Sequence, residues 1–122
     1  MISKAILHWI IYYSSFYGID PMLTKAIILN ESNGNANAIG DKGEIGLMQL
    51  SPDYFYGNLF DPRTNIKLGV RYLSKVKKEC KYKADNTFIN CFNLGVEGGS
   101  KLKHPKSWPY YINTMKLYRE MR

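Results

Sequence analysis

Residues 26–50 read AIILNESNGNANAIGDKGEIGLMQL, an apolar helical run followed by a polar, glycine-rich loop and then by a second apolar run. Glu31 lies at the first junction, where the predicted helix ends. Apolar surroundings disfavour the charged form of a carboxyl group, so they raise its pKa and let it carry a proton at neutral pH. Such a group is suited to protonating a glycosidic oxygen. The alternative is that Glu31 is simply an exposed residue at a helix C-terminus.

The length and composition indicate one globular domain spanning residues 1–122. A chain of 122 residues is long enough for one hydrophobic core and too short for two. Its 45% apolar and 22% charged residues are ordinary for a soluble globular protein. No internal repeat, low-complexity tract or linker interrupts it, so we propose no domain boundary.

The charge balance is strongly basic. A net charge of +7 favours polyanionic partners such as nucleic acid, anionic lipid or an anionic cell wall. The lysines gather in residues 75–83 and 101–106, and neither cluster carries a nucleic-acid-binding motif. We therefore expect attraction to an anionic cell envelope and no nucleic-acid partner, with a merely solvated surface as the alternative.

The N-terminal segment MISKAILHWIIYYSS loosely resembles a signal peptide. However, His8 interrupts the apolar run and no convincing small-residue cleavage site follows. Because Ile6, Trp9, Ile10 and Tyr13 recur at helical spacing, we expect an amphipathic first helix in a mature chain. No apolar stretch is long enough to span a membrane.

Helix start signals recur along the chain, whereas no segment alternates as a strand should. An Asp or Ser before a proline predicts a helix N-terminus at Asp20-Pro21, Ser51-Pro52 and Asp61-Pro62. We expect two further helices, one capped by Asp85 or Asn86 and ended by Gly95, the other opened by Trp108-Pro109. The loop of residues 32–43 forms at most a short hairpin. The predicted fold is mainly α.

The helix assignments also narrow the choice among ten acidic residues. The predicted caps account for three aspartates, and a helix dipole favours Asp53 after Pro52. Glu79 and Glu120 lie among basic residues and read as solvated ion-pair members. The remainder comprises Glu31, Asp41, Glu44 and Glu97, of which only Glu31 continues an apolar helix. The other three lie in glycine-rich loops, where we expect solvent to surround them.

Cys80 and Cys91 are the only cysteines. Their spacing matches no zinc pattern, and no His, Asp or Glu cluster surrounds them, so we expect no metal site. The sequence is compatible with a disulfide between the two cysteines and with two free structural thiols.

Five motifs, taken in order, give the chain a family resemblance. Glu31-Ser32 after an apolar helix is followed by GLMQ at residues 46–49 and NIKLGVRYL at residues 65–73. CFNLG at residues 91–95 resembles an Ala-Tyr-Asn-Ala-Gly motif, and Tyr111-Ile112 a Tyr-Val pair. Together they resemble the soluble lytic transglycosylase (SLT) domain family, goose-type lysozyme-like enzymes that cut peptidoglycan glycan strands. Cys91, Phe92 and Leu94 depart from that family's pattern.

The resemblance implies a single lysozyme-like helical domain with a substrate cleft. It implies cleavage of the β-1,4 bond between N-acetylmuramic acid and N-acetylglucosamine, with Glu31 as the single catalytic acid and base. The muramic acid would be released as a 1,6-anhydro sugar; attack by water instead would make the enzyme a muramidase. A non-catalytic wall-binding module is a third possibility.

By the same resemblance, four further residues are assigned to the substrate site. Gln49 would offer its amide to the sugar or to the surroundings of the acid, and Asn93 would bind an N-acetyl or hydroxyl group. Tyr111 would place its hydroxyl near Glu31 or the substrate, and Ser32 would orient the Glu31 carboxyl or end the helix. Each also has a structural reading: Gln49 as a loop tether, Asn93 as a cap and Tyr111 as core.

We expect no cofactor and a monomer acting at the bacterial cell wall or periplasm. Without a clear leader, the chain fits a phage endolysin released by lysis or an enzyme exported by a specialised route.

Overall fold

The computed structural model describes residues 2–121, which form five α-helices and two short 3-10 helices. The α-helices are α1 (Lys4–Tyr17), α2 (Pro21–Ser32), α3 (Pro62–Glu79), α4 (Ile89–Ser100) and α5 (Pro109–Glu120). The 3-10 helices are η1 (Ala84–Asn86) and η2 (Pro105–Ser107). Within residues 2–121 the only β-type pairings are isolated bridges from Ile45 to Ile39 and to Leu50. The mainly α prediction is confirmed.

Helices α2 and α3 begin where the Asp-Pro signals predicted. Asp20 accepts a hydrogen bond from the Met22 amide at 2.9 Å, and Asp61 accepts one from the Thr64 amide at 3.0 Å. Each proline occupies the first helical turn, where a missing N–H costs nothing. The C-terminal helix also opens at Pro109, as expected.

Two of the predicted starts are wrong. After Ser51-Pro52 the chain makes a single turn, in which the Tyr54 and Phe55 amides both donate to the Ser51 carbonyl. The turn ends before Phe55 and Tyr56, and Gly57 follows with φ +118°, so no helix forms whose dipole could favour Asp53. Neither Asp85 nor Asn86 caps α4: both have positive φ, +56° and +65°, inside η1, and α4 begins after Phe88, which makes no side-chain cap. Asp85 pairs instead with Lys106.

The end of α4 also differs from prediction. Gly95 does interrupt helical geometry, at φ +80° and ψ +161°, but the helix resumes beyond it as far as Ser100. Glycine adopts this conformation without steric cost. The kink therefore turns the chain next to Asn93 without ending α4.

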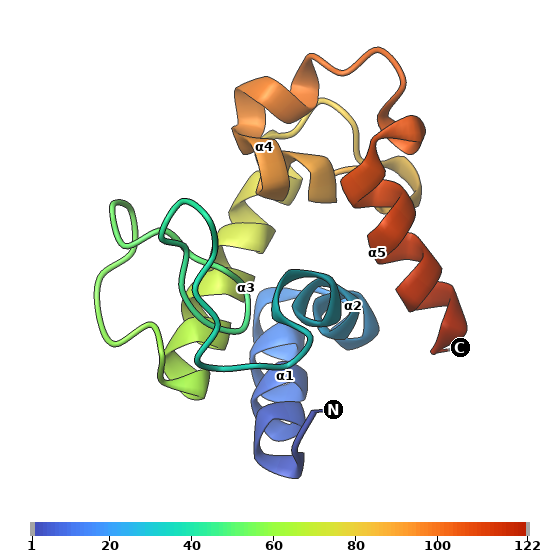
Figure 1. The fold of residues 1–122 in the computed structure, drawn as a ribbon. Coiled ribbons are helices and arrows are strands. Elements are labelled where there is room, and N and C mark those ends of the chain that lie inside the picture. Colours follow the sequence, from blue (N-terminus) through green and yellow to red (C-terminus); the bar gives the residue numbers. More distant parts are fainter. Residues whose placement is uncertain (1, 122) are drawn as a thin grey trace.

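The core lies between α1, α2 and α3. Figure 1 shows α2 nearly end-on in the middle of the molecule, with α1 below it and α3 and α5 on either side. Ile10 of α1, Ile27 and Ile28 of α2, and Leu73 of α3 are completely buried. This packing fixes the C-terminal end of α2, and with it Glu31, against the rest of the domain.

No helix within the described residues is long and apolar enough to cross a membrane.

Cys80 and Cys91 form a disulfide with their Cα atoms 6.1 Å apart. The sequence left this question open. The bond joins the end of α3 to the first turn of α4, immediately before Phe92 and Asn93.

Candidate active site

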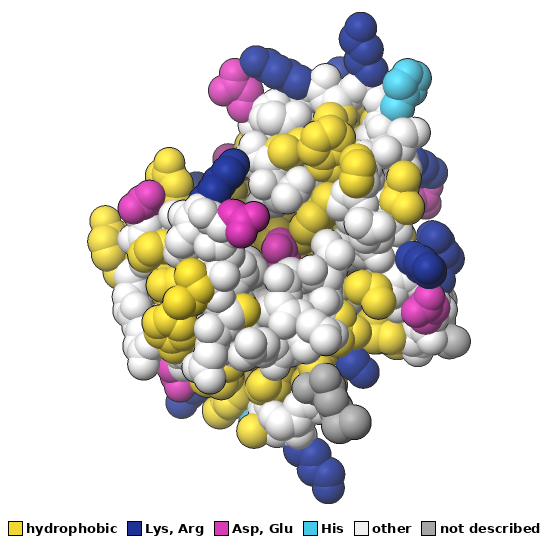
Figure 2. Space-filling model, viewed as in Figure 1, with side chains coloured by type: hydrophobic (Ala, Val, Ile, Leu, Met, Phe, Trp, Pro, Cys, Tyr) yellow, Lys and Arg dark blue, Asp and Glu magenta, His cyan; other side chains and the backbone are white. Residues whose placement is uncertain are grey.

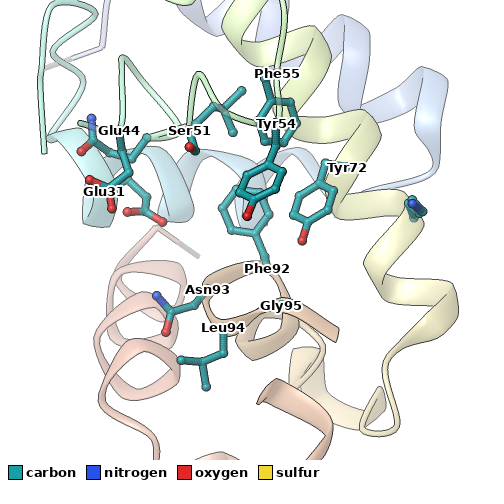
Figure 3. A pocket seen from close by; sticks show the side chains of 13 residues that line it. Glu31, Glu44, Ser51, Tyr54, Phe55, Tyr72, Phe92, Asn93, Leu94 and Gly95 are labelled. Atoms are coloured by element: carbon teal, nitrogen blue, oxygen red, sulfur yellow. The ribbon is translucent and has the colours of Figure 1, made fainter. Parts of the chain in front are cut away.

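A cavity of about 690 Å³ opens beside the C-terminal end of α2. Its walls come from Glu31, from the loop segment containing Glu44, Gln49 and Tyr54, from α3 and from the first half of α4. Figure 3 shows these side chains around a common space, and Figure 2 shows the hollow with acidic side chains in it. Segments far apart in sequence therefore meet at one groove.

Glu31 occupies the last turn of α2, and its pKa is raised from 4.5 to about 7. Burial is the largest cause, because it removes water from the charged form. Glu44 adds to the rise through like-charge repulsion, whereas a hydrogen bond from Tyr110 opposes it. Both protonation states of the carboxyl are therefore accessible near neutral pH, which suits a group that gives and takes protons.

Tyr110 is the residue that contacts Glu31. It lies at the start of α5, is almost completely buried, and donates its hydroxyl to Glu31 Oε2 at 3.0 Å. Burial, and then the neighbouring Glu31 charge, raise the pKa of Tyr110 well above its ordinary value. Its hydroxyl thus stays protonated and donates to the carboxylate at neutral pH.

Tyr111, expected near Glu31 or the substrate, lies away from the Glu31 carboxyl in the structure. The Tyr111 hydroxyl donates to the Asp85 backbone carbonyl at 2.8 Å, and Tyr111 does not line the cavity. Adjacent residues of a helix point about 100° apart, so a one-residue difference changes the neighbour completely. The sequence offered two neighbouring tyrosines, and only the fold distinguishes Tyr110 from Tyr111.

Ser32 contacts the loop and not the Glu31 carboxyl. Its Oγ donates toward the Leu47 carbonyl at 2.8 Å and the Ile28 carbonyl at 3.2 Å, and it accepts from the Gly34 amide. Ser32 therefore ties the end of α2 to the GLMQ segment. It does not line the cavity.

Gln49 lines the cavity and also holds its own loop. Its Nε2 donates to the carbonyls of Gly46, at 3.0 Å, and Ala38, at 3.3 Å. Its backbone has φ +53°, which is uncommon outside glycine and directs the side chain back over the loop. The amide nitrogen is thus engaged within the loop, and the amide oxygen lies close to Gly40.

Asn93 lines the cavity from α4, and its Oδ1 accepts a hydrogen bond from Trp108 Nε1 at 2.9 Å. Among the described residues its amide nitrogen has no hydrogen-bond partner. Asn93 is therefore held in one orientation with its donor group available to a bound sugar.

Sequence reasoning missed Glu44 as a site residue. It was expected in solvent, but it is only partly exposed and shares the cavity with Glu31. One of its oxygens accepts from the Lys42 amide at 2.9 Å, which fixes the side chain against its own turn. Nothing in the local sequence distinguishes Glu44 from Asp41, which is exposed.

Asn65 of α3 holds the preceding loop in place through three hydrogen bonds to its backbone. It is completely buried: Oδ1 accepts from the Met48 amide at 2.8 Å, and Nδ2 donates to the Ile45 and Leu59 carbonyls, each at 2.9 Å. A Cβ on Gly46 would lie 2.4 Å from Asn65 Nδ2, so the glycine is required for this close contact. The motif at residues 65–73 thus holds the motif at residues 46–49 in place through Asn65.

Aromatic rings line the opposite wall of the cavity. Tyr72 of α3 packs edge-on against Phe55, with centroids 5.5 Å apart, and lies 5.7 Å from Phe92 of α4. Tyr54 adds a strongly exposed ring at the rim. Aromatic faces suit the apolar faces of sugar rings.

Within the described residues no group of His, Cys, Asp and Glu could hold a metal ion.

A helical domain with a glutamate of raised pKa in a cavity with an aromatic wall has the features expected of the lysozyme-like class of domains. Residues 8–97 match the model of the transglycosylase SLT domain, which covers more than half of the chain. The chain belongs to this family.

Individual relatives agree with this placement. The chain is 31% identical over 130 residues to membrane-bound lytic murein transglycosylase E of Buchnera aphidicola subsp. Baizongia pistaciae, an alignment covering 86% of this chain and 60% of the relative. It is 37% identical over 73 residues to endo-type membrane-bound lytic murein transglycosylase A of Klebsiella pneumoniae, covering 48% of this chain and 36% of the relative. The chain thus spans 60% or less of these relatives.

The 70 kDa soluble lytic transglycosylase SLT70 of Escherichia coli has a similar structure. It superposes with a TM-score of 0.69 and 22% sequence identity, over 93% of this chain and 24% of that one. The lysozyme-like helical fold implied by the motifs is confirmed.

Proposed function

We propose that this chain cleaves the β-1,4 bond between N-acetylmuramic acid and N-acetylglucosamine in peptidoglycan, as a lytic transglycosylase with Glu31 as its acid and base. The supporting observation is the Glu31 carboxyl itself, with a pKa of about 7 inside the cavity and held by Tyr110. A module that only binds glycan has no need of such a group. The names of the SLT-domain relatives support the same reaction.

In the first step, protonated Glu31 gives its proton to the glycosidic oxygen as the bond to the muramic acid breaks. Positive charge develops at the anomeric carbon, and the substrate's own acetamido carbonyl stabilises it. The Tyr110 hydroxyl then stabilises the Glu31 carboxylate, because a hydrogen bond to the charged form favours it.

In the second step, the Glu31 carboxylate takes the proton of the C6 hydroxyl of the same sugar. The C6 oxygen attacks the anomeric carbon and closes a 1,6-anhydro ring. Glu31 regains its proton, no water is consumed, and the enzyme is ready for the next bond.

A hydrolytic muramidase is the second candidate, and the position of Glu44 favours it. A second carboxylate beside the acid could activate a water molecule, as in glycosidases that use a pair of carboxyl groups. The reaction would then add water at the anomeric carbon.

The proposed substrate groups around the acid are the Gln49 amide oxygen and the Asn93 amide nitrogen, with the aromatic wall beneath the sugar rings. For Ser32 we propose a structural role at the end of α2. Tyr111 supports the site through its bond to Asp85, next to the Lys106 ion pair.

Digestion of purified murein, followed by mass spectrometry, tests the proposal. We expect products that are one water lighter than the corresponding hydrolysis products, and no cleavage by Glu31→Gln. Hydrolysed ends would establish the muramidase instead, whereas cleavage by Glu31→Gln would remove Glu31 from the mechanism.

We propose that the chain acts as a monomer at the cell wall or periplasm, without a cofactor or a nucleic-acid partner. The disulfide supports an oxidising compartment, and the net charge of +7 supports attraction to the anionic envelope. For its route there we propose release at phage-induced lysis or export by a specialised system.

A further inference from the structure

The outward side of α1 exposes several large apolar side chains. The inward half buries Ile6, Ile10, Tyr13 and Ser14. On the outward half, large apolar side chains are 37–71% exposed, and we call this set the α1 face: Leu7, Ile11, Tyr12 and Phe16. At 3.6 residues per turn these positions form two pairs on the outward side of the helix, Leu7 with Ile11 and Tyr12 with Phe16, and the exposed Lys4, His8 and Ser15 lie between the pairs.

This pattern is unusual for a helix in contact with water. A surface helix normally presents charged residues outward, whereas a helix that is apolar all round is covered by something. In α1 the sequence KAILHWIIYYSSFY contains one lysine and no acidic residue. The α1 face therefore indicates an interaction surface.

A row of cations runs beside α1 on the neighbouring helix α3. Four of the exposed basic residues of α3 recur there at the helical spacings of four and seven residues, so they share one side of the helix, whereas Lys75 lies toward the cavity that it lines. We call this set the basic row: Arg63, Lys67, Arg71 and Lys78. Glu79, the one acidic residue of α3, lies on a different side of the helix, where its charge helps to raise the pKa of Tyr72 in the cavity wall.

The basic row follows the seam between the two helices. At one end the Arg63 guanidinium lies 4.6 Å from the centre of the Trp9 ring, and its Nε donates to the Tyr13 hydroxyl at 3.0 Å. At the other end Lys78 lines a shallow depression together with Tyr17 and Gly18. The basic row therefore borders the side of α1 that carries Tyr12 and Phe16.

We infer that the α1 face and the basic row together dock this domain on an anionic phospholipid surface, with α1 lying in the plane of the headgroups. An interfacial helix buries large apolar side chains below the headgroups, and adjacent lysines and arginines bind anionic lipid. A second copy of the chain is a poor occupant, because it would bring two basic rows together. Wall glycan offers no apolar phase for Ile11 or Phe16.

Docking through this surface leaves the cavity open. No described residue of α1 lines the cavity, whose walls come from α2, the loop, α3 and α4. Figure 1 shows α1 and α4 at opposite ends of the molecule. A domain held by α1 could therefore still receive a glycan strand running above the membrane. The inference does not depend on the proposed function.

Co-sedimentation of the whole chain with phosphatidylglycerol vesicles tests the inference, with phosphatidylcholine vesicles as the neutral control. We expect binding to phosphatidylglycerol that weakens with added salt, and much weaker binding to phosphatidylcholine. The double variant Ile11→Ser/Phe16→Ser should lose about tenfold or more in affinity. A matched double variant, Ile39→Ser/Tyr56→Ser, removes two exposed apolar side chains elsewhere and should bind like the wild type.

The charge contribution has its own pair of variants. Lys67→Gln/Arg71→Gln should weaken binding to phosphatidylglycerol by severalfold, whereas Lys103→Gln/Lys116→Gln, with the same loss of charge, should not. Circular dichroism checks that each variant is folded. Three outcomes overturn the inference: equal binding to both lipids, no binding to phosphatidylglycerol, or wild-type binding by Ile11→Ser/Phe16→Ser. A wild-type dimer in solution that this α1 variant dissociates would also overturn it, by assigning the face to a second copy.

Discussion

The Tyr110 hydroxyl lies 3.0 Å from Glu31 Oε2, although the two residues are 79 positions apart in the sequence. The contact joins α5 to the end of α2, where Glu31 lines the cavity. Two opposing effects meet there: burial favours the neutral Glu31 carboxyl, and the Tyr110 hydrogen bond favours the charged one. Their balance holds the pKa of Glu31 near neutrality, where a single group can act as acid and then as base.

Replacing Tyr110 by Phe removes the hydrogen bond to the charged form, so the pKa of Glu31 should rise further. Activity that requires protonated Glu31 should then persist to higher pH. The rate at neutral pH should nevertheless fall by about 10- to 100-fold, because the carboxylate formed in the first step loses its donor. The pH dependence of kcat/KM on soluble glycan fragments measures both effects.

Tyr111→Phe is the matched control. It removes the bond to the Asp85 carbonyl and should cost about 1 kcal/mol of stability, but it should leave the pH profile unchanged. The role given to Tyr110 is wrong if the two variants exchange these behaviours.

Glu44→Gln should shift the pH profile in the opposite direction. The Glu44 charge raises the pKa of Glu31 by repulsion, so its removal lowers that pKa. The loss of activity with rising pH should therefore begin at lower pH than in the wild type. Asp41→Asn, an exposed change in the same loop, should have no such effect. An unchanged profile in Glu44→Gln would mean that the two carboxylates do not interact.

Glu31→Gln should abolish glycan cleavage and make the protein more stable above neutral pH. The pKa of Glu31 rises from 4.5 to about 7 on folding, so the folded state binds the proton more tightly than the unfolded state. Stability is then complete below pH 4.5 and declines as pH rises to about 7, by at most about 3 kcal/mol. Glutamine carries no charge, so the variant does not lose stability as the pH rises through this range.

Urea unfolding at pH 4 and pH 8 measures the effect. We expect similar stability for wild type and Glu31→Gln at pH 4, and a more stable variant at pH 8. A variant equally stable or less stable than the wild type at pH 8 would show that Glu31 is well solvated, which would also undermine its proposed role.

These residues mark what the sequence could reveal about the site. Glu31 was identifiable because both the apolar helix and the loop that surround it are local in sequence. Tyr110 and Glu44 were not, since their roles depend on contacts that only tertiary packing creates. The hydroxyl of Tyr110 differs from that of Tyr111 only in the direction its helix gives it.

The same distinction holds for the fold. Asp20-Pro21 and Asp61-Pro62 opened helices because cap, proline and a long apolar face agree. Ser51-Pro52 has the cap and the proline, but Gly57 and the next N-cap at Asp61 follow too closely for a helix to form. A start signal alone predicts a turn as readily as a helix.

Asn65→Ala should destabilise the domain by about 2–4 kcal/mol. The substitution leaves the Met48 amide and the Ile45 and Leu59 carbonyls without their buried partner. Denaturant unfolding measures the loss, and Asn113→Ala on the exposed side of α5 is the control. A loss below 1 kcal/mol would mean that the loop does not depend on Asn65.

The disulfide should matter for the cavity as well as for stability. It joins α3 to the first turn of α4, directly before Phe92 and Asn93 in the cavity wall. Cys80→Ala/Cys91→Ala should lower the free energy of unfolding by about 2–3 kcal/mol, since the loop that it closes is short. Freed from α3, the start of α4 should hold Phe92 and Asn93 less firmly, so KM should rise severalfold with a smaller change in kcat.

Kinetics on soluble glycan fragments at a temperature where the variant is fully folded separate this effect from unfolding. The single replacement Ser100→Ala removes a nearby side chain without breaking the bond, and it should leave KM unchanged. If the double variant matches the wild type in KM, the disulfide stabilises the domain without shaping the groove.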